Sequence, residues 1–290
     1  QKKKKGFEEV RERLLSKGYR RADIELKVED IFFGKKYRKA PWEKVGQVRR
    51  MPGIINEYVE AIMSHVDVEG IRKRKFKVVV DPGNGVGALA APKLLSLLGC
   101  EVLAINSNVD GRFPGREPEP TKKSLRHLAE VVKATGADLG VGYDGDADRA
   151  IFVDERGEVH WGDKSLAIVE KYYFMEHPGE TIVTPVSSSQ IVKEIADMYG
   201  GKVFWTKVGS VVVSRVMVEK GYSLGGEENG GIMYGPHQPV RDGAMTTALM
   251  LDIMQRTGKK LSELVEELPR FYGDKDKVFC PNERKAEVLE

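Results

Sequence analysis

An acidic turn carries the clearest chemical signal in the sequence. Residues 142–152 read GYDGDADRAIF, which places Asp144, Asp146 and Asp148 at every second position with one small residue between neighbours. Three carboxylates this close repel one another unless a cation lies among them. Ligand sets made only of oxygen suit Mg2+ or Ca2+ better than zinc or copper. The turn therefore predicts a site for a hard divalent cation, with a solvated acidic hairpin as the alternative.

Calcium bound by an EF-hand loop is a second interpretation of the same turn. Positions 1, 3, 5 and 12 of such a loop would be Asp144, Asp146, Asp148 and Glu155. Position 6 requires glycine for the sharp turn, but Arg149 stands there and the flanking residues read as strands. We therefore favour Mg2+ with open coordination positions that substrate or phosphate oxygens fill. Arg149 can pair with a carboxylate or hold a phosphate.

A glycine-rich turn precedes the acidic one. Residues 81–88 read DPGNGVGA, so Gly83, Gly85 and Ala88 satisfy the G-x-G-x-x-G/A pattern of dinucleotide-binding turns. This pattern is short and common, and the next predicted strand ends at Asn106 without an acidic residue to bind a ribose. We interpret the segment as a structural tight turn.

A second acidic loop has a composition suited to a sugar. Residues 225–231 read GGEENGG and combine two carboxylates and an amide with glycines that let a ligand approach the backbone. Because carboxylates accept hydrogen bonds from paired hydroxyls, Glu227 and Asn229 suit a polyol. A polar hairpin turn is the alternative.

Charged side chains in neighbouring loops extend this chemistry. Lys207 stands at the end of a predicted strand, and His237 and Arg241 lie between two predicted elements. His237 can serve as an acid or a base, or it can be merely solvated. We expect Asp242 to cap a helix that starts at Gly243.

The elements that must position these loops form two series of similar order. In the first, strands over 77–81 and 101–105 flank a helix over 88–98. In the second, a strand over 181–184 and a strand over 202–206 flank a helix over 191–199, which Gly200 and Gly201 close. Each series predicts a βαβ unit.

The two series predict two α/β domains of similar topology with mixed sheets. Strands over 137–143 and 221–226 lead directly into the acidic loops. Open α/β sheets bind ligands at the carboxyl ends of their strands. We therefore place one domain at 68–162 and the other at 163–273, in tandem, each with an acidic loop at that edge. We expect residues 7–67 to be mainly helical, including a helix over 54–63.

The composition excludes several classes of partner. The 290 residues include 47 basic and 44 acidic side chains, a net charge of +3, and this near balance argues against nucleic acid. Cys100 and Cys280 match no metal-ligand spacing and predict no disulfide framework. No apolar run is long enough to span a membrane, and no signal-peptide core follows the N-terminal lysines. We expect a cytoplasmic protein that binds neither nucleic acid nor a membrane.

Four motifs together resemble the α-D-phosphohexomutase family, the phosphoglucomutases and phosphomannomutases. They are DGDADR at 144–149, TKVG at 206–209, GEENGG at 226–231 and RDG at 241–243. In that family four domains surround a cleft and supply, in order, a phosphoserine, a Mg2+ loop, a sugar-recognition loop and a phosphate-binding loop. The resemblance covers roughly residues 31–290 and implies metal ligands Asp144, Asp146 and Asp148, catalytic residues Lys207 and Arg149, and substrate-binding residues Glu227, Asn229, Gly209 and His237.

The sequence departs from the family pattern in two ways. The family's Thr-Ala-Ser-His-Asn-Pro phosphoserine loop and its terminal Arg-x-Ser-Gly-Thr loop are absent, and the one Ser-His pair, Ser64 and His65, is followed by valine. Many members also carry serine where Asn229 stands and histidine where Gly231 stands. By resemblance, residues 1–67 would be a helical tail of a first domain and residues 274–290 the start of a last one.

The resemblance implies a mutase that moves a phosphoryl group between C1 and C6 of a hexose phosphate. It implies Mg2+ as cofactor, and hexose phosphate and hexose 1,6-bisphosphate as ligands, with transfer through a phosphoserine. Because the serine loop is absent, we expect the chain alone to bind these ligands but to turn over poorly. Alternatives are a phosphoglucosamine mutase, a non-catalytic module that binds phosphosugars or divalent metal, and a Mg2+-dependent phosphatase with an aspartate nucleophile.

Overall fold

The computed structural model describes residues 21–271, 279–281, 284, 287 and 288. The chain divides into two units, residues 1–51 and 52–290, and each is described by itself. The predicted helical structure before residue 21 falls outside the described residues. So does most of the predicted start of a further domain at 274–290.

The described part of the first unit, residues 21–51, is less helical than its sequence predicts. Helix α2 covers Arg21–Phe33, and the 3-10 helix η1 covers Trp42–Lys44. The prediction of a mainly helical stretch is wrong for 36–53, where η1 is the only helix described. Pro41 is one physical cause, because proline lacks the N–H that a helix needs and disfavours helical conformation in the residue before it. The backbone of Pro41 is extended, with ψ 156°.

The second unit opens with two helices. Helix α3 covers Ile54–Met63, which confirms the predicted helix there, and it buries Val59 and Ile62. Helix α4 covers Val68–Arg74 and is capped by Asp67, whose carboxylate accepts a hydrogen bond from the amide of Gly70. Such a cap satisfies an amide that would otherwise lack a partner in the first turn.

The first sheet has the strand order β2-β1-β3-β4-β5. Strands β1, β2 and β3 are parallel, whereas β4 and β5 are antiparallel to their neighbours. The strands are β1 (Lys77–Asp81), β2 (Glu101–Ala104), β3 (Leu139–Tyr143), β4 (Ala150–Asp154) and β5 (Val159–His160). The helices among them are η2 (Val86–Leu89), α5 (Ala91–Leu97) and α6 (Arg126–Thr135).

The second sheet repeats this arrangement with the order β7-β6-β8-β9. Strands β6, β7 and β8 are parallel and β9 is antiparallel to β8. The strands are β6 (Thr181–Pro185), β7 (Lys202–Thr206), β8 (Leu224–Gly226) and β9 (Ile232–Tyr234). The helices are α7 (Gly162–Glu176), α8 (Ile191–Tyr199), α9 (Ser210–Lys220), α10 (Gly243–Thr257) and α11 (Leu261–Glu266). The predicted pair of α/β folds with similar topology and mixed sheets is confirmed.

Helices cover both faces of each sheet. Val78 and Val80 of β1 pack into a large core shared with α5, α7, α8 and α10, whereas Val79 faces the smaller core beneath α6. In the second sheet Val183 of β6 faces a small core beneath α9, and Ile182 faces the shared core. This alternation follows from the two-residue period of a strand.

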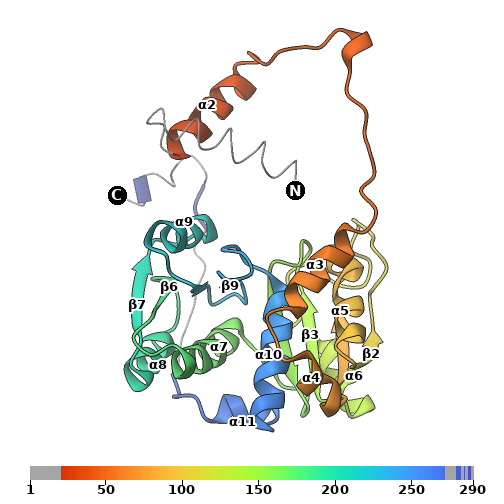
Figure 1. Ribbon diagram of the computed structural model, residues 1–290, viewed down its shortest axis with the longest axis vertical. Coiled ribbons are helices and arrows are strands. Elements are labelled where there is room, and N and C mark those ends of the chain that lie inside the picture. Colours follow the sequence, from red (N-terminus) through yellow and green to blue (C-terminus); the bar gives the residue numbers. More distant parts are fainter. Residues whose placement is uncertain (1–20, 272–278, 282–283, 285–286, 289–290) are drawn as a thin grey trace. The chain divides into compact units, whose positions relative to one another are not determined.

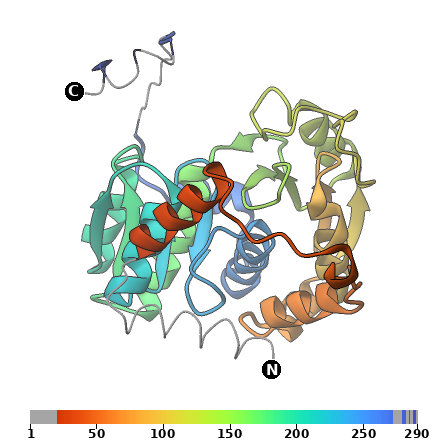
Figure 2. The same ribbon diagram turned by 90° about the horizontal axis from the view of Figure 1, so that it is seen from above.

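Helix α10 joins the two sheets. It lies between them in both views (Figure 1, Figure 2) and contacts α3, α4, α5, α7, β4 and β9. Most of its residues are buried. Asp252 of α10 accepts a hydrogen bond from the amide of Asp67, which ties α10 to the start of α4. Residues that follow or precede α10 therefore have a fixed position relative to both sheets.

One acidic side chain of the core lacks a partner. Glu170 of α7 is 0% exposed, and neither of its carboxylate oxygens has a hydrogen-bond partner among the described residues. Burial raises the pKa of Glu170 well above its ordinary value. The folded protein therefore keeps this carboxyl protonated at a pH at which the unfolded chain ionises it.

We expect Glu170→Gln to raise the free energy of unfolding at pH 8 by on the order of 1–3 kcal/mol and to change it little at pH 4. The unfolded carboxyl loses its proton above about pH 4.3, while burial holds the proton on the folded carboxyl to a higher pH. The stability of the parent chain therefore falls, relative to the variant, as the pH rises above that value. Urea titrations of both proteins between pH 4 and 8 measure this difference in the free energy of unfolding.

Glu130→Gln is the matched control, because the Glu130 side chain is 65% exposed on α6. For this control, the difference in unfolding free energy from the parent is expected not to grow with pH. Equal pH dependence in the parent and in Glu170→Gln would contradict a neutral buried carboxyl.

Candidate functional site

The two acidic loops occupy the same place in the two sheets. The aspartate loop, residues 144–149, joins β3 to β4, and the glutamate loop, residues 227–231, joins β8 to β9. Both therefore lie at the carboxyl ends of parallel strands. The loops also contact each other, because the amide of Ala150 donates to the carbonyl of Gly230 over 3.1 Å.

Glycine makes this close approach possible. A methyl group added at Gly162, the first residue of α7, would lie 2.0 Å from the amide nitrogen of Gly230. A methyl group on Gly230 would lie 2.6 Å from the carbonyl oxygen of Ala150, and Gly230 has a φ of +92° that favours glycine. The spacing between the two loops therefore requires glycine at both positions.

The three aspartates form a group that can hold a metal ion. Asp144 is buried, Asp148 is half-buried and Asp146 is exposed, and each offers an oxygen within 4.8 Å of the others. Ala147 has a φ of +60°, which gives the loop its tight turn. Asp148 Oδ1 is buried and has no hydrogen-bond partner in the described part of the chain. Arg149 Nε lies 3.6 Å from this oxygen, beyond hydrogen-bond distance, so the oxygen can still ligate a cation.

The electrostatics of Asp148 agree with this. Burial raises the pKa of Asp148 to about 6, and the negative charges of Asp144 and Asp146 add to the effect, while Arg241 opposes it. Burial and neighbouring negative charges thus oppose ionisation of Asp148. A divalent cation bound there would stabilise the ionised form.

Arg149 is paired with carboxylates. Its Nε donates to Asp144 Oδ2 over 2.7 Å, and an Nη donates to Glu119 Oε1 over 2.6 Å. Its backbone amide donates to the other oxygen of Asp144 over 3.1 Å. Arg149 could pair with a carboxylate or hold a phosphate, and in this structure it pairs with carboxylates. Glu119 was missed by sequence reasoning, since it lies in a loop without a recognisable pattern.

A buried ion pair supports the aspartate loop from below. Arg116 Nε donates to Asp81 Oδ2 over 2.9 Å, and both side chains are at most 5% exposed. A terminal nitrogen of Arg116 also donates to the carbonyl of Tyr143 over 2.6 Å. The pair thereby joins the carboxyl ends of β1 and β3, immediately before the aspartate loop. Sequence reasoning also missed this pair.

The glycine-rich turn packs against these groups. A methyl group added at Gly83 would lie 2.7 Å from Cζ of Arg116, and one added at Gly85 would lie 2.5 Å from the carbonyl oxygen of Gly145. The amide of Val86 donates to that same carbonyl over 3.2 Å. These contacts support the interpretation of residues 81–88 as a structural turn.

The glutamate loop holds one buried polar side chain, Glu227, and two half-buried ones, Glu228 and Asn229. Glu227 is 5% exposed, and its Oε2 accepts a hydrogen bond from an Nη of Arg241 over 2.8 Å. Asn229 Oδ1 accepts a hydrogen bond from the amide of Gly231 over 3.2 Å. The other Nη of Arg241 donates to Asp148 Oδ2. One guanidinium thus joins the two acidic loops, a role that the sequence did not indicate.

Lys207 and Gly209 lie on the second sheet's side of the site. Lys207 is exposed and follows directly after β7, and Gly209 precedes α9 with a φ of +128°. Within the described residues, no ion pair or side-chain hydrogen bond joins Lys207 to either acidic loop. The structure therefore brings the aspartates, Arg149, Glu227 and Asn229 together without a direct contact to Lys207.

His237 lies in a separate buried cluster. Its side chain is 7% exposed, and Nε2 is 3.3 Å from Asp242 Oδ2. Its ring lies 6.0 Å from that of Tyr58 and 5.6 Å from that of His65. Asp242 caps α10 as predicted, because its carboxylate accepts from the amide of Met245 over 2.9 Å. His237 is thus held against α3 and is not brought to the acidic loops.

Asp242 is the charged centre of this cluster. Burial alone would raise the pKa of Asp242, but the nearby His237 ring and hydrogen bonds from the amide of Met245 and from Tyr58 outweigh it and lower the pKa. Asp242 therefore stays ionised, and its negative charge stabilises the N-terminus of α10.

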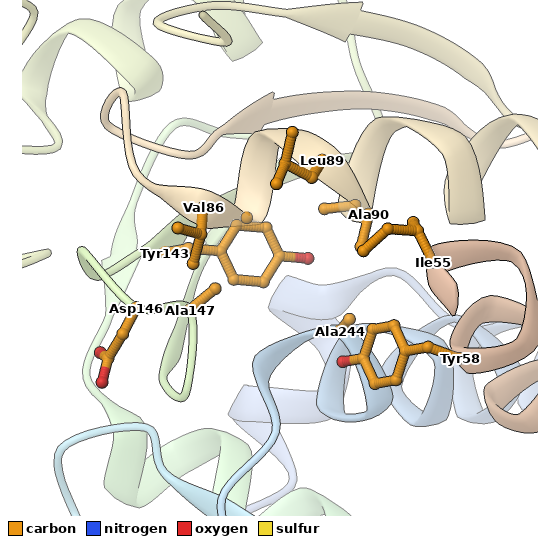
Figure 3. A pocket seen from close by; sticks show the side chains of 11 residues that line it. Ile55, Tyr58, Val86, Leu89, Ala90, Tyr143, Asp146, Ala147 and Ala244 are labelled. Carbon is orange, nitrogen blue, oxygen red and sulfur yellow. The ribbon is translucent and has the colours of Figure 1, made fainter. Parts of the chain in front are cut away.

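An apolar pocket borders the aspartate loop. It has a volume of about 230 Å³ and is lined mainly by apolar and aromatic side chains from α3, η2, α5, β3 and α10. Figure 3 shows Tyr143 and Val86 within it, whereas the carboxylate of Asp146 lies at its edge and points away from them. The pocket leaves one side of the aspartate loop open.

No helix in the described part of the chain is long and apolar enough to cross a membrane.

Comparison with known proteins identifies similar chains. The family model described as phosphoglucomutase/phosphomannomutase, alpha/beta/alpha domain II, matches residues 56–157, and that for domain III matches residues 161–272. A phosphoglucomutase/phosphomannomutase of Thermococcus kodakarensis is 46% identical over 261 residues, which are 90% of this chain and 57% of the relative. A phosphoglucosamine/phosphogalactosamine mutase of Sulfurisphaera tokodaii is 45% identical over 89% of this chain and 57% of its own length.

Solved structures agree with these relatives. The crystal structure of a phosphoglucomutase/phosphomannomutase family protein from Burkholderia thailandensis has a TM-score of 0.70 and 30% identity, and the match covers 75% of this chain and 47% of that one. The chain thus spans somewhat over half the length of the curated relatives it matches.

We expect the chain to bind Mg2+ and Asp146→Asn to weaken this binding about tenfold or more, since affinity depends on the number of charged ligands. Asp146 is exposed, so the substitution should leave the fold intact. Calorimetric titration with Mg2+ measures the affinity, and the shift of the unfolding temperature with Mg2+ provides a second readout.

Asp197→Asn is the control, because Asp197 is an exposed aspartate of α8 that pairs with Lys193. Equal Mg2+ affinity in the parent and in Asp146→Asn would show that the aspartate loop does not bind the cation.

Proposed function

Because the chain belongs to the phosphoglucomutase/phosphomannomutase family, we propose that it forms the metal-binding and sugar-binding core of a phosphohexomutase. The reaction would move a phosphoryl group between C1 and C6 of a hexose phosphate through a hexose 1,6-bisphosphate and a phosphoserine. One observation carries this proposal: Arg241 joins a carboxylate of the aspartate loop to a carboxylate of the glutamate loop. Metal and sugar ligands would therefore share one site.

In this proposal Asp144, Asp146 and Asp148 hold Mg2+. Support comes from their mutual distances and from the buried Oδ1 of Asp148, which accepts no hydrogen bond within the described residues. When bound, Mg2+ would neutralise negative charge that builds on the transferring phosphoryl group. Oxygen ligands and open coordination positions favour Mg2+ among the divalent metals.

Two cations of the chain would act on phosphate groups. Arg149 is held by Asp144 and Glu119, so its planar guanidinium has a fixed orientation beside the aspartates. Lys207 is an exposed point charge on a flexible stem at the end of β7. We assign both as catalytic residues: Arg149 as the fixed group beside the metal, and Lys207 as the mobile group that reaches a phosphate.

The glutamate loop would recognise the sugar. Glu227 and Asn229 offer carboxylate and amide groups that hydrogen-bond hydroxyls. Gly209 leaves the backbone amides at the start of α9 accessible to an oxygen of the substrate. His237 was expected to bind substrate directly, but its burial against Asp242 and Tyr58 favours a supporting role, in which it holds the segment that carries Arg241.

A hexosamine phosphate is the second candidate substrate. The observation that favours it is the Sulfurisphaera tokodaii relative, which is named a phosphoglucosamine/phosphogalactosamine mutase and is nearly as similar as the Thermococcus kodakarensis one. Binding of glucose 6-phosphate and of glucosamine 6-phosphate, measured side by side, separates the two.

We expect glucose 1,6-bisphosphate to raise the Mg2+ affinity of the chain by about fivefold or more, because coupled sites commonly differ by such factors. Asn229→Ala should reduce this gain and leave binding of Mg2+ alone unchanged, since no hydrogen bond joins Asn229 to the aspartates among the described residues. Calorimetric Mg2+ titrations with and without the bisphosphate measure both quantities.

Asn56→Ala, an exposed substitution on α3, is the control and should preserve the gain. Absence of any gain in the parent chain would argue against a shared site. It would favour the non-catalytic metal-binding module.

We further expect the purified chain to interconvert glucose 1-phosphate and glucose 6-phosphate poorly or not at all, because its sequence contains no phosphoserine loop of the family type. A dehydrogenase-coupled assay with Mg2+ and the bisphosphate measures turnover. Robust mutase activity would overturn this expectation. An aspartyl phosphate trapped on Asp144 or Asp146 would point to a phosphatase instead.

A further inference from the structure

Gly231 and Arg241 fit together in a way that explains the glycine. Gly231 is not among the glycines with positive φ, so its backbone does not require glycine. A methyl group added there would nevertheless lie 2.2 Å from Cδ and 2.9 Å from Cγ of Arg241. The aliphatic part of Arg241 therefore fills the space that a side chain at position 231 would occupy.

The guanidinium of Arg241 is held between carboxylates of two different loops. One Nη donates to Glu227 Oε2 over 2.8 Å and the other to Asp148 Oδ2. The Arg241 side chain is 20% exposed, and that of Glu227 is 6% exposed. Partial exclusion of water strengthens both ion pairs relative to surface pairs.

The backbone around Arg241 is anchored to both hairpins. The amide of Asp242 donates to the carbonyl of Ile232 on β9 over 3.1 Å, and the amide of Gly243 donates to the carbonyl of Ala147 in the aspartate loop over 3.1 Å. Arg241 immediately precedes these two residues. Its position relative to both acidic loops is thus fixed by hydrogen bonds that do not involve its own side chain.

We propose that Arg241 couples cation binding at the aspartate loop to sugar-phosphate binding at the glutamate loop, so that each depends on the other. This proposal rests on the function proposed above for the two loops. When Asp148 ligates a cation, its bond to Arg241 weakens. The guanidinium, still held by Glu227, can then offer N–H donors to an oxygen of a phosphate group.

This arrangement predicts effects of opposite sign. Arg241 competes with a cation for Asp148 and adds positive charge nearby, so its removal should tighten Mg2+ binding in the absence of sugar phosphate. The same removal leaves Glu227 without its partner and takes away a phosphate donor, so it should diminish the effect of the bisphosphate on Mg2+ affinity. A residue needed only for folding would weaken both.

The test uses Mg2+ calorimetry with and without glucose 1,6-bisphosphate on the parent chain, Arg241→Ala and Arg241→Lys. For Arg241→Ala we expect Mg2+ alone to bind about threefold tighter or more, and the gain from the bisphosphate to fall below about twofold. Lysine retains the charge but cannot bridge two carboxylates in a fixed plane. Arg241→Lys should therefore keep the parent's Mg2+ affinity and recover only part of the gain.

Arg156→Ala is the matched control, because Arg156 also pairs with a glutamate but is 59% exposed and lies on the loop after β4. It should resemble the parent in both titrations. If the parent shows the gain and Arg241→Ala keeps it, the role of Arg241 is overturned while the proposed function stands. Weaker Mg2+ binding in both Arg241 variants would likewise overturn it in favour of a structural role. No gain in the parent itself would overturn the proposed function.

Discussion

Repulsion among carboxylates is the constraint on which this site depends. Three carboxylates from loops of two different sheets lie close together, those of Asp144, Asp148 and Glu227. Their negative charges would destabilise the fold if no cation opposed them. Arg149 neutralises the first and Arg241 lies between the other two. The compensation is incomplete, because the buried Oδ1 of Asp148 accepts no hydrogen bond within the described residues and lies 3.6 Å from Arg149 Nε. That residual charge is what a divalent cation would neutralise, so a metal site follows from the balance of charges as well as from the motif.

The fold meets this constraint by bringing the two sheets together through α10. The helix packs in a core shared by both sheets, and the segment before it is hydrogen-bonded to Ile232 in one hairpin and to Ala147 in the other. Gly162 and Gly230 remove the side chains that would keep the hairpins apart. Backbone contacts thus position the two loops.

Much of this could be predicted from the sequence, for physical reasons. The strands, both acidic loops and the cap at Asp242 follow from local patterns, since strand period, glycine placement and capping act over a few residues. The contacts of Arg116 with Asp81 and of Arg241 with Glu227 could not be predicted, because each joins residues whose approach depends on the packing of whole elements. The helical prediction for 36–53 failed because Pro41 interrupts this segment and its apolar residues do not recur at helical spacing.

The duplicated topology explains why Arg241, the residue that joins the two acidic loops, belongs to neither of them. Each sheet presents its loop at the same position, after the third strand in its order, so the two loops are equivalent in fold but differ in chemistry. Arg241 precedes α10, which is anchored to both sheets, and its space is provided by the absent side chain of Gly231. The guanidinium of Arg241, held at this third position, is affected by the charge of either loop. Ligand binding at one loop can therefore alter the affinity of the other loop for its ligand.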